Sequence, residues 1–155
     1  VSLAAEARRV ADYYEAALEE RGVVLRCEGD AIVAANAGLV RRALANLISN
    51  AIKATPRGGE IVLACQPQPQ GARVEVRNPG DPIPAADLPR IFDRFFRSGQ
   101  ARAPRSEGHG LGLAIVRAIA RMHGGEVDAA SGPGGTVVGI TLRGPAPTGP
   151  NITKK

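Results

Sequence analysis

Apolar residues recur at helical spacing in three stretches of the chain. The first spans residues 2–20, where apolar side chains recur in three- and four-residue steps among acids and arginines, and Gly22 ends it. The second begins at Asn36, which can cap a helix that runs to about residue 55, where a proline and two glycines stop it. The third, residues 111–122, is almost entirely apolar, so we expect a buried helix there.

Elsewhere the pattern changes to the two-residue period of strands. Residues 60–66 and 73–77 alternate around a turn of Pro, Gln and Gly. Residues 126–130 and 136–142 flank a run of Ser, Gly and Pro. Both pairs predict β-hairpins, because turn residues between two alternating runs bring neighbouring strands together.

Two short apolar runs near the start, residues 23–27 and 31–34, are split by three turn-forming residues, which predicts a further hairpin. Cys27 and Cys65 lie in strand-like runs, far apart and without a C-x-x-C or metal-binding spacing. We therefore expect both thiols to be small core side chains.

The order of elements is helix, hairpin, helix, hairpin, loop, helix, hairpin. Hairpins favour a mixed, mostly antiparallel sheet, and the helices can cover one of its faces. The sequence thus predicts an α+β fold, a two-layer α/β sandwich in which three helices cover one face of the sheet. We expect a single domain over residues 1–143 and a flexible tail over residues 144–155, where Pro, Thr, Gly and Lys predominate.

The 155 residues carry a net charge of +5, which admits an anionic ligand. The arginines are scattered, however, so a solvated surface is favoured over a nucleic-acid tract. With two tyrosines, three phenylalanines and no tryptophan, ring stacking on bases is not expected either. No apolar run reaches the roughly 20 residues of a membrane span and no signal peptide opens the chain, so we expect a soluble, cytoplasmic domain.

The second predicted helix has a polar face on a different side from its apolar stripe, which consists of Val40, Leu44, Leu47, Ile48 and Ala51. Arg42, Asn46, Asn50 and Lys53 project together from this polar face, because three- and four-residue steps stay on one face. Asparagine is a poor helix former, and a merely solvated face would favour Glu or Lys. An amide oxygen suits Mg²⁺ and a lysine ammonium suits phosphate, which makes this face a candidate binding site.

Three glycines at alternate positions, Gly108, Gly110 and Gly112, come at the start of the third helix. Glycine lets the backbone approach a ligand closely, and N–H groups at a helix N-terminus attract anions. The pattern is neither G-x-G-x-x-G nor a Walker loop, and alone it is equally compatible with a hinge. The irregular segment before it, residues 78–107, is too long for a simple connection and is typical of a binding loop or lid.

In this order, the segments resemble the catalytic domain of sensor histidine kinases, a member of the ATP-binding superfamily shared with gyrase, Hsp90 and MutL. The loop from Asn78 to Phe95 is similar to that of the heavy-metal-sensing subgroup. The matching segments are an N box (42–53), a G1 box (78–83), an F box (91–97), a G2 box (108–113) and a final glycine–threonine element (134–136).

The resemblance implies a site for ATP and Mg²⁺. Asn50 would bind the metal, and the catalytic residues would be Asn46, Lys53 and Arg97. Asn78 would face the adenine amino group. The nucleotide-binding residues implied in this way are Asn46, Asn50, Lys53, Asn78, Gly80, Ile83, Phe92, Arg97, Gly108, His109, Gly110, Leu111, Gly112 and Thr136.

Several residues depart from the family's pattern. The G1 box normally opens with Asp, whereas Asn78 is neutral and can accept only through its amide carbonyl. Pro82 replaces the second glycine of that box, Ala54 stands where an aromatic residue usually closes the pocket, and Phe96 stands where Tyr is common. These changes suggest weaker ATP binding or an altered base selectivity.

The implied reaction is transfer of the γ-phosphoryl group of ATP to a histidine on a separate dimerisation domain of the same protein, with a response regulator downstream. Neither His109 nor His123 lies in an acceptor motif, so we expect a monomeric fragment of an inner-membrane kinase with little turnover alone. Asn46 stands where related hydrolases have a glutamate base, which favours transfer over hydrolysis. The alternatives are a non-catalytic nucleotide sensor, an anti-sigma-type serine/threonine kinase, an ATPase of the superfamily and, from charge alone, a DNA-binding module.

Overall fold

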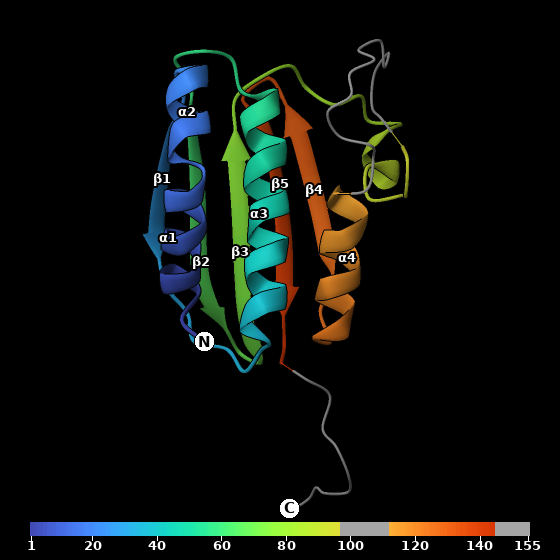
Figure 1. Ribbon diagram of the computed structural model, residues 1–155. Coiled ribbons are helices and arrows are strands. Elements are labelled where there is room, and N and C mark those ends of the chain that lie inside the picture. Colours follow the sequence, from blue (N-terminus) through green and yellow to red (C-terminus); the bar gives the residue numbers. More distant parts are fainter. Residues whose placement is uncertain (97–111, 145–155) are drawn as a thin grey trace, which may run out of the picture.

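The computed structural model describes residues 1–96 and 112–144. They form one five-stranded sheet with the helices on one face (Figure 1). The strand order is β1-β2-β3-β5-β4, with β1 and β2 parallel and the other pairs antiparallel, which confirms the predicted α+β sandwich. In chain order the elements are α1 (Leu3–Tyr13), α2 (Glu15–Arg21), β1 (Val24–Gly29), α3 (Ala37–Ala54), β2 (Glu60–Gln68), β3 (Gly71–Asn78), the 3₁₀ turn η1 (Leu88–Arg90), α4 (Gly112–Met122), β4 (Val127–Gly132) and β5 (Gly135–Leu142).

The first predicted helix is two helices in the structure. Between α1 and α2 the backbone of Tyr14 leaves the helical conformation, with φ −94° and ψ 9°. The Tyr14 ring packs edge-on against Tyr13, with the ring centroids 5.2 Å apart. Within the described residues, four α-helices therefore cover the sheet instead of the three expected.

The predicted hairpin of residues 23–27 and 31–34 is wrong, because β1 pairs in parallel with β2. Asp30 accounts for the difference. Its carboxylate accepts hydrogen bonds from the Ser2 hydroxyl at 3.1 Å and from the Ala4 N–H at 2.8 Å. The second run is thereby held against the start of the chain, with which it also pairs through backbone hydrogen bonds. The two hairpins β2–β3 and β4–β5 are confirmed.

The two cysteines have opposite environments. Cys27 lies on β1, an edge strand, and is exposed, so the prediction that it belongs to the core is wrong. Cys65 lies on β2 and is buried, as predicted, and this burial raises the pKa of its thiol to about 12. The difference follows from the strand order, since β2 has a neighbour on both sides and the helices over one face.

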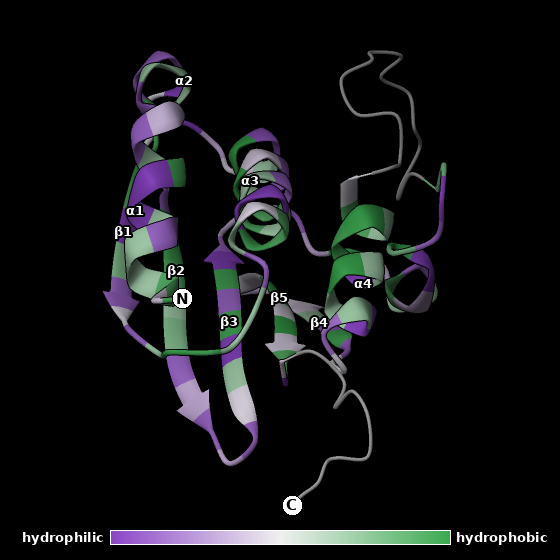
Figure 2. Ribbon diagram, turned by 60° about the horizontal axis from the view of Figure 1, so that its bottom comes forward, coloured by the Kyte–Doolittle hydropathy of each residue, from purple (hydrophilic) through white to green (hydrophobic). Residues whose placement is uncertain are grey.

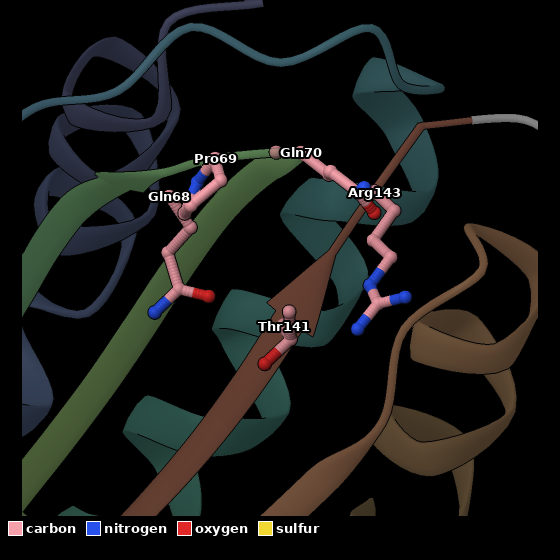
Figure 3. A pocket seen from close by; sticks show the side chains of 6 residues that line it. Gln68, Pro69, Gln70, Thr141 and Arg143 are labelled. Carbon is pink, nitrogen blue, oxygen red and sulfur yellow. The ribbon is translucent and has the colours of Figure 1, made fainter.

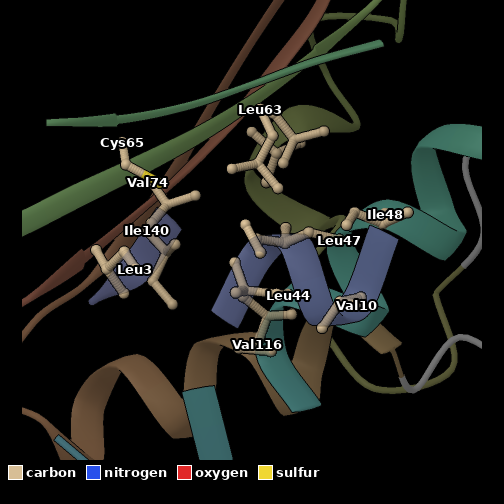
Figure 4. Packing of buried hydrophobic residues seen from close by; sticks show 14 of the residues in the cluster. Leu3, Val10, Leu44, Leu47, Ile48, Leu63, Cys65, Val74, Val116 and Ile140 are labelled. Carbon is tan, nitrogen blue, oxygen red and sulfur yellow. The ribbon is translucent and has the colours of Figure 1, made fainter. Parts of the chain in front are cut away.

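The core fills the space between the sheet and the helices (Figure 4). α4 is apolar over most of its surface (Figure 2), and it buries Val116 and Ile119. Among the described helices, none combines the length and apolar character needed to cross a membrane. Burying each large apolar side chain contributes about 1.5–3 kcal/mol. α3 buries the whole of its predicted apolar stripe, Val40, Leu44, Leu47, Ile48 and Ala51.

The face of the sheet away from the helices carries charged side chains. Arg73 of β3 reaches across β5 to β4, where its Nη1 and Nη2 donate to the Asp128 carboxylate at 2.8 and 2.9 Å. Gly139 of β5 leaves room for this crossing, since a β-carbon there would lie 2.2 Å from Arg73 Nη2. The hydrogen bonds from Arg73 lower the pKa of Asp128, although desolvation opposes them.

Candidate functional site

The predicted site residues that the structure describes lie at one end of the molecule, where α3 and β3 end and α4 begins (Figure 1). Asn50 and Lys53 are exposed, and Asn46 is half-buried. All three lie on a different side of α3 from its apolar stripe, as the helical period predicted. The packing of that stripe fixes the rotation of α3 and so aims these side chains at the site.

Asn46 faces the first residue of α4. A β-carbon built on Gly112 would lie 3.9 Å from the β-carbon, the γ-carbon and the amide oxygen of Asn46. The amide nitrogen Nδ2 of Asn46 is buried and has no hydrogen-bond partner among the described residues. Buried donors are nearly always paired in folded proteins. This N–H group is therefore available to an acceptor that enters between α3 and α4.

Arginines hold the end of α3 and the end of α2. Arg21 Nη2 donates to the carbonyl oxygens of Lys53 and Thr55, at 3.0 and 3.1 Å. Arg57, which follows α3, donates from Nη2 to the carbonyl oxygen of Glu20 at 2.8 Å. A cation satisfies the last carbonyls of a helix and is favoured by its dipole. Arg21 of α2 thus caps the end of α3, and Arg57 after α3 caps the end of α2. The sequence analysis did not identify either of these two caps.

The loop of residues 78–83 passes over the end of α3. Gly80 has φ 139°, which side-chain-bearing residues rarely adopt, and a β-carbon there would lie 2.6 Å from the carbonyl oxygen of Ala54. Asn78, which ends β3, is half-buried, and its Nδ2 donates to the carbonyl oxygen of Pro79 at 2.7 Å. The amide oxygen of Asn78 is thus the atom left to accept from a ligand.

A serine that sequence reasoning did not identify holds the other end of this loop. The Ile83 N–H donates to Ser131 Oγ at 2.8 Å, and Ser131 Oγ lies 2.8 Å from Thr136 Oγ1. Thr136, a predicted site residue, is buried and pairs with Asn78 between β5 and β3. Ile83, Thr136 and Asn78 are therefore brought together.

The segment of residues 91–96 contacts α4. Phe92 is buried and packs into the core, and Asp93 forms an ion pair with Arg117 of α4 at 3.7 Å. Phe92 also lines a groove of about 540 Å³ between this segment, α4 and β4. Its contact with a nucleotide stays a prediction. The remaining predicted site residues, Arg97, Gly108, His109, Gly110 and Leu111, lie outside the described residues.

A separate hollow of about 220 Å³ lies at the far end of the sheet, where β2 turns into β3 (Figure 3). No residue predicted to bind nucleotide lines it. In the described ranges, no three His, Cys, Asp or Glu side chains are grouped so that they could hold a metal ion. The hollow is lined by Gln68, Pro69, Gln70, Gly71, Thr141 and Arg143.

The sequence matches known proteins over most of its length. Residues 35–146 match the family of histidine kinase-, DNA gyrase B-, and HSP90-like ATPases. The chain is 47% identical to the sensor histidine kinase CusS of Escherichia coli K12 over 143 residues, which are 92% of this chain and 30% of that protein. It is 42% identical to the sensor protein CzcS of Cupriavidus metallidurans over 145 residues, 94% of this chain and again 30% of that protein. The chain thus spans about 30% of the length of these curated relatives.

The fold agrees with this match. The solved structure of the mycobacterial sensor histidine kinase MprB superposes with a TM-score of 0.77 and 28% identity, covering 94% of this chain and 97% of that chain. In this chain the end of α3, the loop of residues 78–83 and the start of α4 lie close together. The chain therefore belongs to the family of histidine kinase-, DNA gyrase B- and HSP90-like ATPases, as a catalytic ATP-binding domain of the sensor histidine kinase type.

Proposed function

We propose that this domain binds Mg-ATP and donates its γ-phosphoryl group to a histidine on a separate dimerisation domain of the parent protein. The observation that carries the proposal is the Nδ2 of Asn46, which has no hydrogen-bond partner within residues 1–96 and 112–144. A buried donor without a partner costs about 1–3 kcal/mol. A phosphate oxygen between α3 and α4 would satisfy this donor with a charge-assisted hydrogen bond.

The neighbouring residues suit the rest of a nucleotide and its metal. Asn50, one turn beyond Asn46, offers an exposed amide oxygen of the hard kind that Mg²⁺ prefers, and Lys53 offers an ammonium for the phosphates. When bound, Mg²⁺ would neutralise charge on the phosphate oxygens. The Asn78 amide oxygen would accept from the adenine amino group, and Arg97 would approach the phosphates.

Transfer to histidine fits the chemistry better than hydrolysis. The amide of Asn46 has no basic atom with which to activate water. Positioning and charge neutralisation, which Asn46 and Lys53 can supply, are the main demands of phosphoryl transfer. The histidine-bearing domain, a downstream response regulator, a membrane anchor and a cytoplasmic position for this domain would be features of the parent protein. On its own the domain would be a monomer with little turnover.

A second function, nucleotide binding without catalysis, is favoured by two observations. Asn78 is neutral, and its amide nitrogen is engaged within its own loop. Ala54 is exposed at the side of the site that an aromatic residue would close. Both features would weaken or alter binding of the base and leave the phosphate-binding residues in place. The second function therefore uses the same site as the first but lacks the transfer of a phosphoryl group.

Calorimetric titration of ATP with Mg²⁺ tests the site, with Asn46→Asp as the variant and Asn36→Asp as its control. We expect binding of roughly −6 to −8 kcal/mol for the natural sequence. Asn46→Asp replaces a donor with a negative charge, so it should weaken binding at least about tenfold, worth about 1.4 kcal/mol. Asn36 caps the other end of the same helix, where Asp caps equally well, so its variant should bind normally.

Addition of a histidine-bearing dimerisation domain from a sensor kinase then separates the two functions. Phosphate transfer to its histidine supports the kinase, and ATP binding without transfer supports the regulatory domain. The absence of ATP binding at millimolar nucleotide would overturn both.

A further inference from the structure

We propose that Ser131 is a positioning residue that holds the loop of residues 78–83, here termed the base loop, and thereby sets selectivity for the nucleotide base. The inference rests on the proposed ATP binding and deepens it. Ser131 lies on β4, and its hydroxyl is the side-chain group to which the far end of the base loop is hydrogen-bonded.

The base loop is fixed at both ends by the β4–β5 hairpin. At its start, Asn78 pairs with Thr136, and a β-carbon on Gly135 would lie 2.3 Å from the Asn78 carbonyl oxygen. At its end, the Ile83 N–H donates to Ser131 Oγ at 2.8 Å. The contacts at the start involve backbone atoms, whereas the contact at the end depends on one hydroxyl. Substitution of Ser131 therefore releases one end of the loop while the strands stay paired.

The same hydroxyl takes part in a second hydrogen bond. A serine hydroxyl offers two acceptor lone pairs and one hydrogen. Ser131 Oγ accepts from the Ile83 N–H and also lies 2.8 Å from Thr136 Oγ1, where either hydroxyl can donate to the other. When Ser131 donates, the Thr136 hydroxyl keeps its own hydrogen for a ligand. Ser131 thus acts on two predicted nucleotide-binding residues without being one itself.

The base loop and the phosphate side of the site rest on different elements. Asn46, Asn50 and Lys53 belong to α3, whose rotation is fixed by the core, and none of them contacts Ser131 through a hydrogen bond in the described structure. Loss of the Ser131 hydroxyl should therefore weaken recognition of the base more than recognition of the phosphates. A merely structural role would lower affinity for all nucleoside triphosphates alike.

The test compares ATP with inosine triphosphate, which lacks the exocyclic amino group that Asn78 would bind. Ser131→Ala should weaken ATP binding about tenfold and inosine triphosphate binding less than about twofold, and Ser131→Thr, which keeps the hydroxyl, should restore the preference for ATP. Thr141→Ala, at the far end of β5, is the matched control and should change neither affinity. Equal losses for both nucleotides, or an unchanged affinity for ATP, would overturn the inference.

Amide hydrogen exchange of Ile83 in the nucleotide-free domain gives a second measurement. Ser131→Ala should speed this exchange at least about tenfold, because the amide loses its acceptor, while core amides of β3 stay protected. Unchanged exchange would overturn the anchoring step. If the natural sequence bound no ATP, the proposed function would be overturned. If the natural sequence and Ser131→Ala bound ATP equally well, only this inference would be overturned.

Discussion

Gly80 approaches Ala54 so closely that a β-carbon on the glycine would lie 2.6 Å from the Ala54 carbonyl oxygen. The contact joins the base loop to the last residue of α3, the helix that carries Asn46 and Asn50. The neighbouring atom is backbone and cannot rotate away, and φ at Gly80 is 139°, in the range that favours glycine. The base loop and the end of α3, which carry the base side and the phosphate side of the proposed site, thus meet at Gly80, where there is no room for a side chain.

Replacement of Gly80 should therefore cost both stability and ligand binding. We expect Gly80→Ala to lower the free energy of unfolding by about 2–4 kcal/mol, through backbone strain and the clash with Ala54, and to abolish measurable ATP binding. Gly58→Ala is the matched control, because Gly58 has φ 90° but nothing within 4 Å of a built β-carbon. It should cost about 1–2 kcal/mol through strain alone and leave ATP binding intact. Equal costs, measured by denaturant unfolding, would contradict this interpretation.

The reciprocal arginine caps give a second prediction. Arg21→Ala removes two hydrogen bonds from the end of α3, and Arg57→Ala removes one from the end of α2. Each should lower the free energy of unfolding by about 1 kcal/mol. Only Arg21→Ala should also weaken ATP binding, by a few-fold. The reason is that Arg21 caps α3, whose last turns carry Asn50 and Lys53, whereas Arg57 caps α2, which carries no site residue. Titration of both variants checks this, and a matching loss of affinity in Arg57→Ala would count against it.

His123 connects the end of α4 to the start of α3. It is buried, its Nδ1 lies 2.8 Å from the carbonyl oxygen of Ile119, and its Nε2 accepts from the Asn36 N–H at 3.2 Å. Because Nε2 accepts, the ring should be neutral with its proton on Nδ1, which nitrogen NMR can verify. His123→Ala should lower the free energy of unfolding by about 2–4 kcal/mol, since it opens a cavity and leaves the Asn36 N–H unpaired. A proton found on Nε2 would rule this network out.

Local periodicity predicted where the helices and two of the three hairpins lie, although it merged α1 and α2 into one helix. It failed where a distant partner decided the strand pairing. The alternation in residues 23–27 indicates a strand but does not say that its neighbour is β2, which follows only after α3. What redirected residues 31–34 was the Asp30 carboxylate, through its bonds to Ser2 and Ala4. Turn-forming residues in a sequence do not indicate such side-chain contacts with distant residues.

The same distinction applies to the site. Asn46, Asn50 and Lys53 could be grouped from sequence because they lie on one helix and share its period. Ser131 and Arg21 could not, since their partners are 48 and 32 residues away along the chain. A lone serine before a turn and a lone arginine at a helix end are common surface residues, and only their hydrogen bonds distinguish them.

The ion pair between Arg73 and Asp128 should make stability depend on acid pH. The pKa of Asp128 is lowered in the folded protein, so its contribution is fully present above the ordinary value of 3.8 and is lost as the pH falls through the lowered one. Because Asp128 is more than half exposed, we expect the contribution to be only about 0.5–1 kcal/mol. Asp128→Asn should therefore be less stable than the natural sequence at about pH 7, and urea unfolding should find the difference gone near pH 2. Gly139→Ala, which displaces the Arg73 guanidinium, should behave in the same way. A difference of equal size at both pH values would show that the ion pair is not its source.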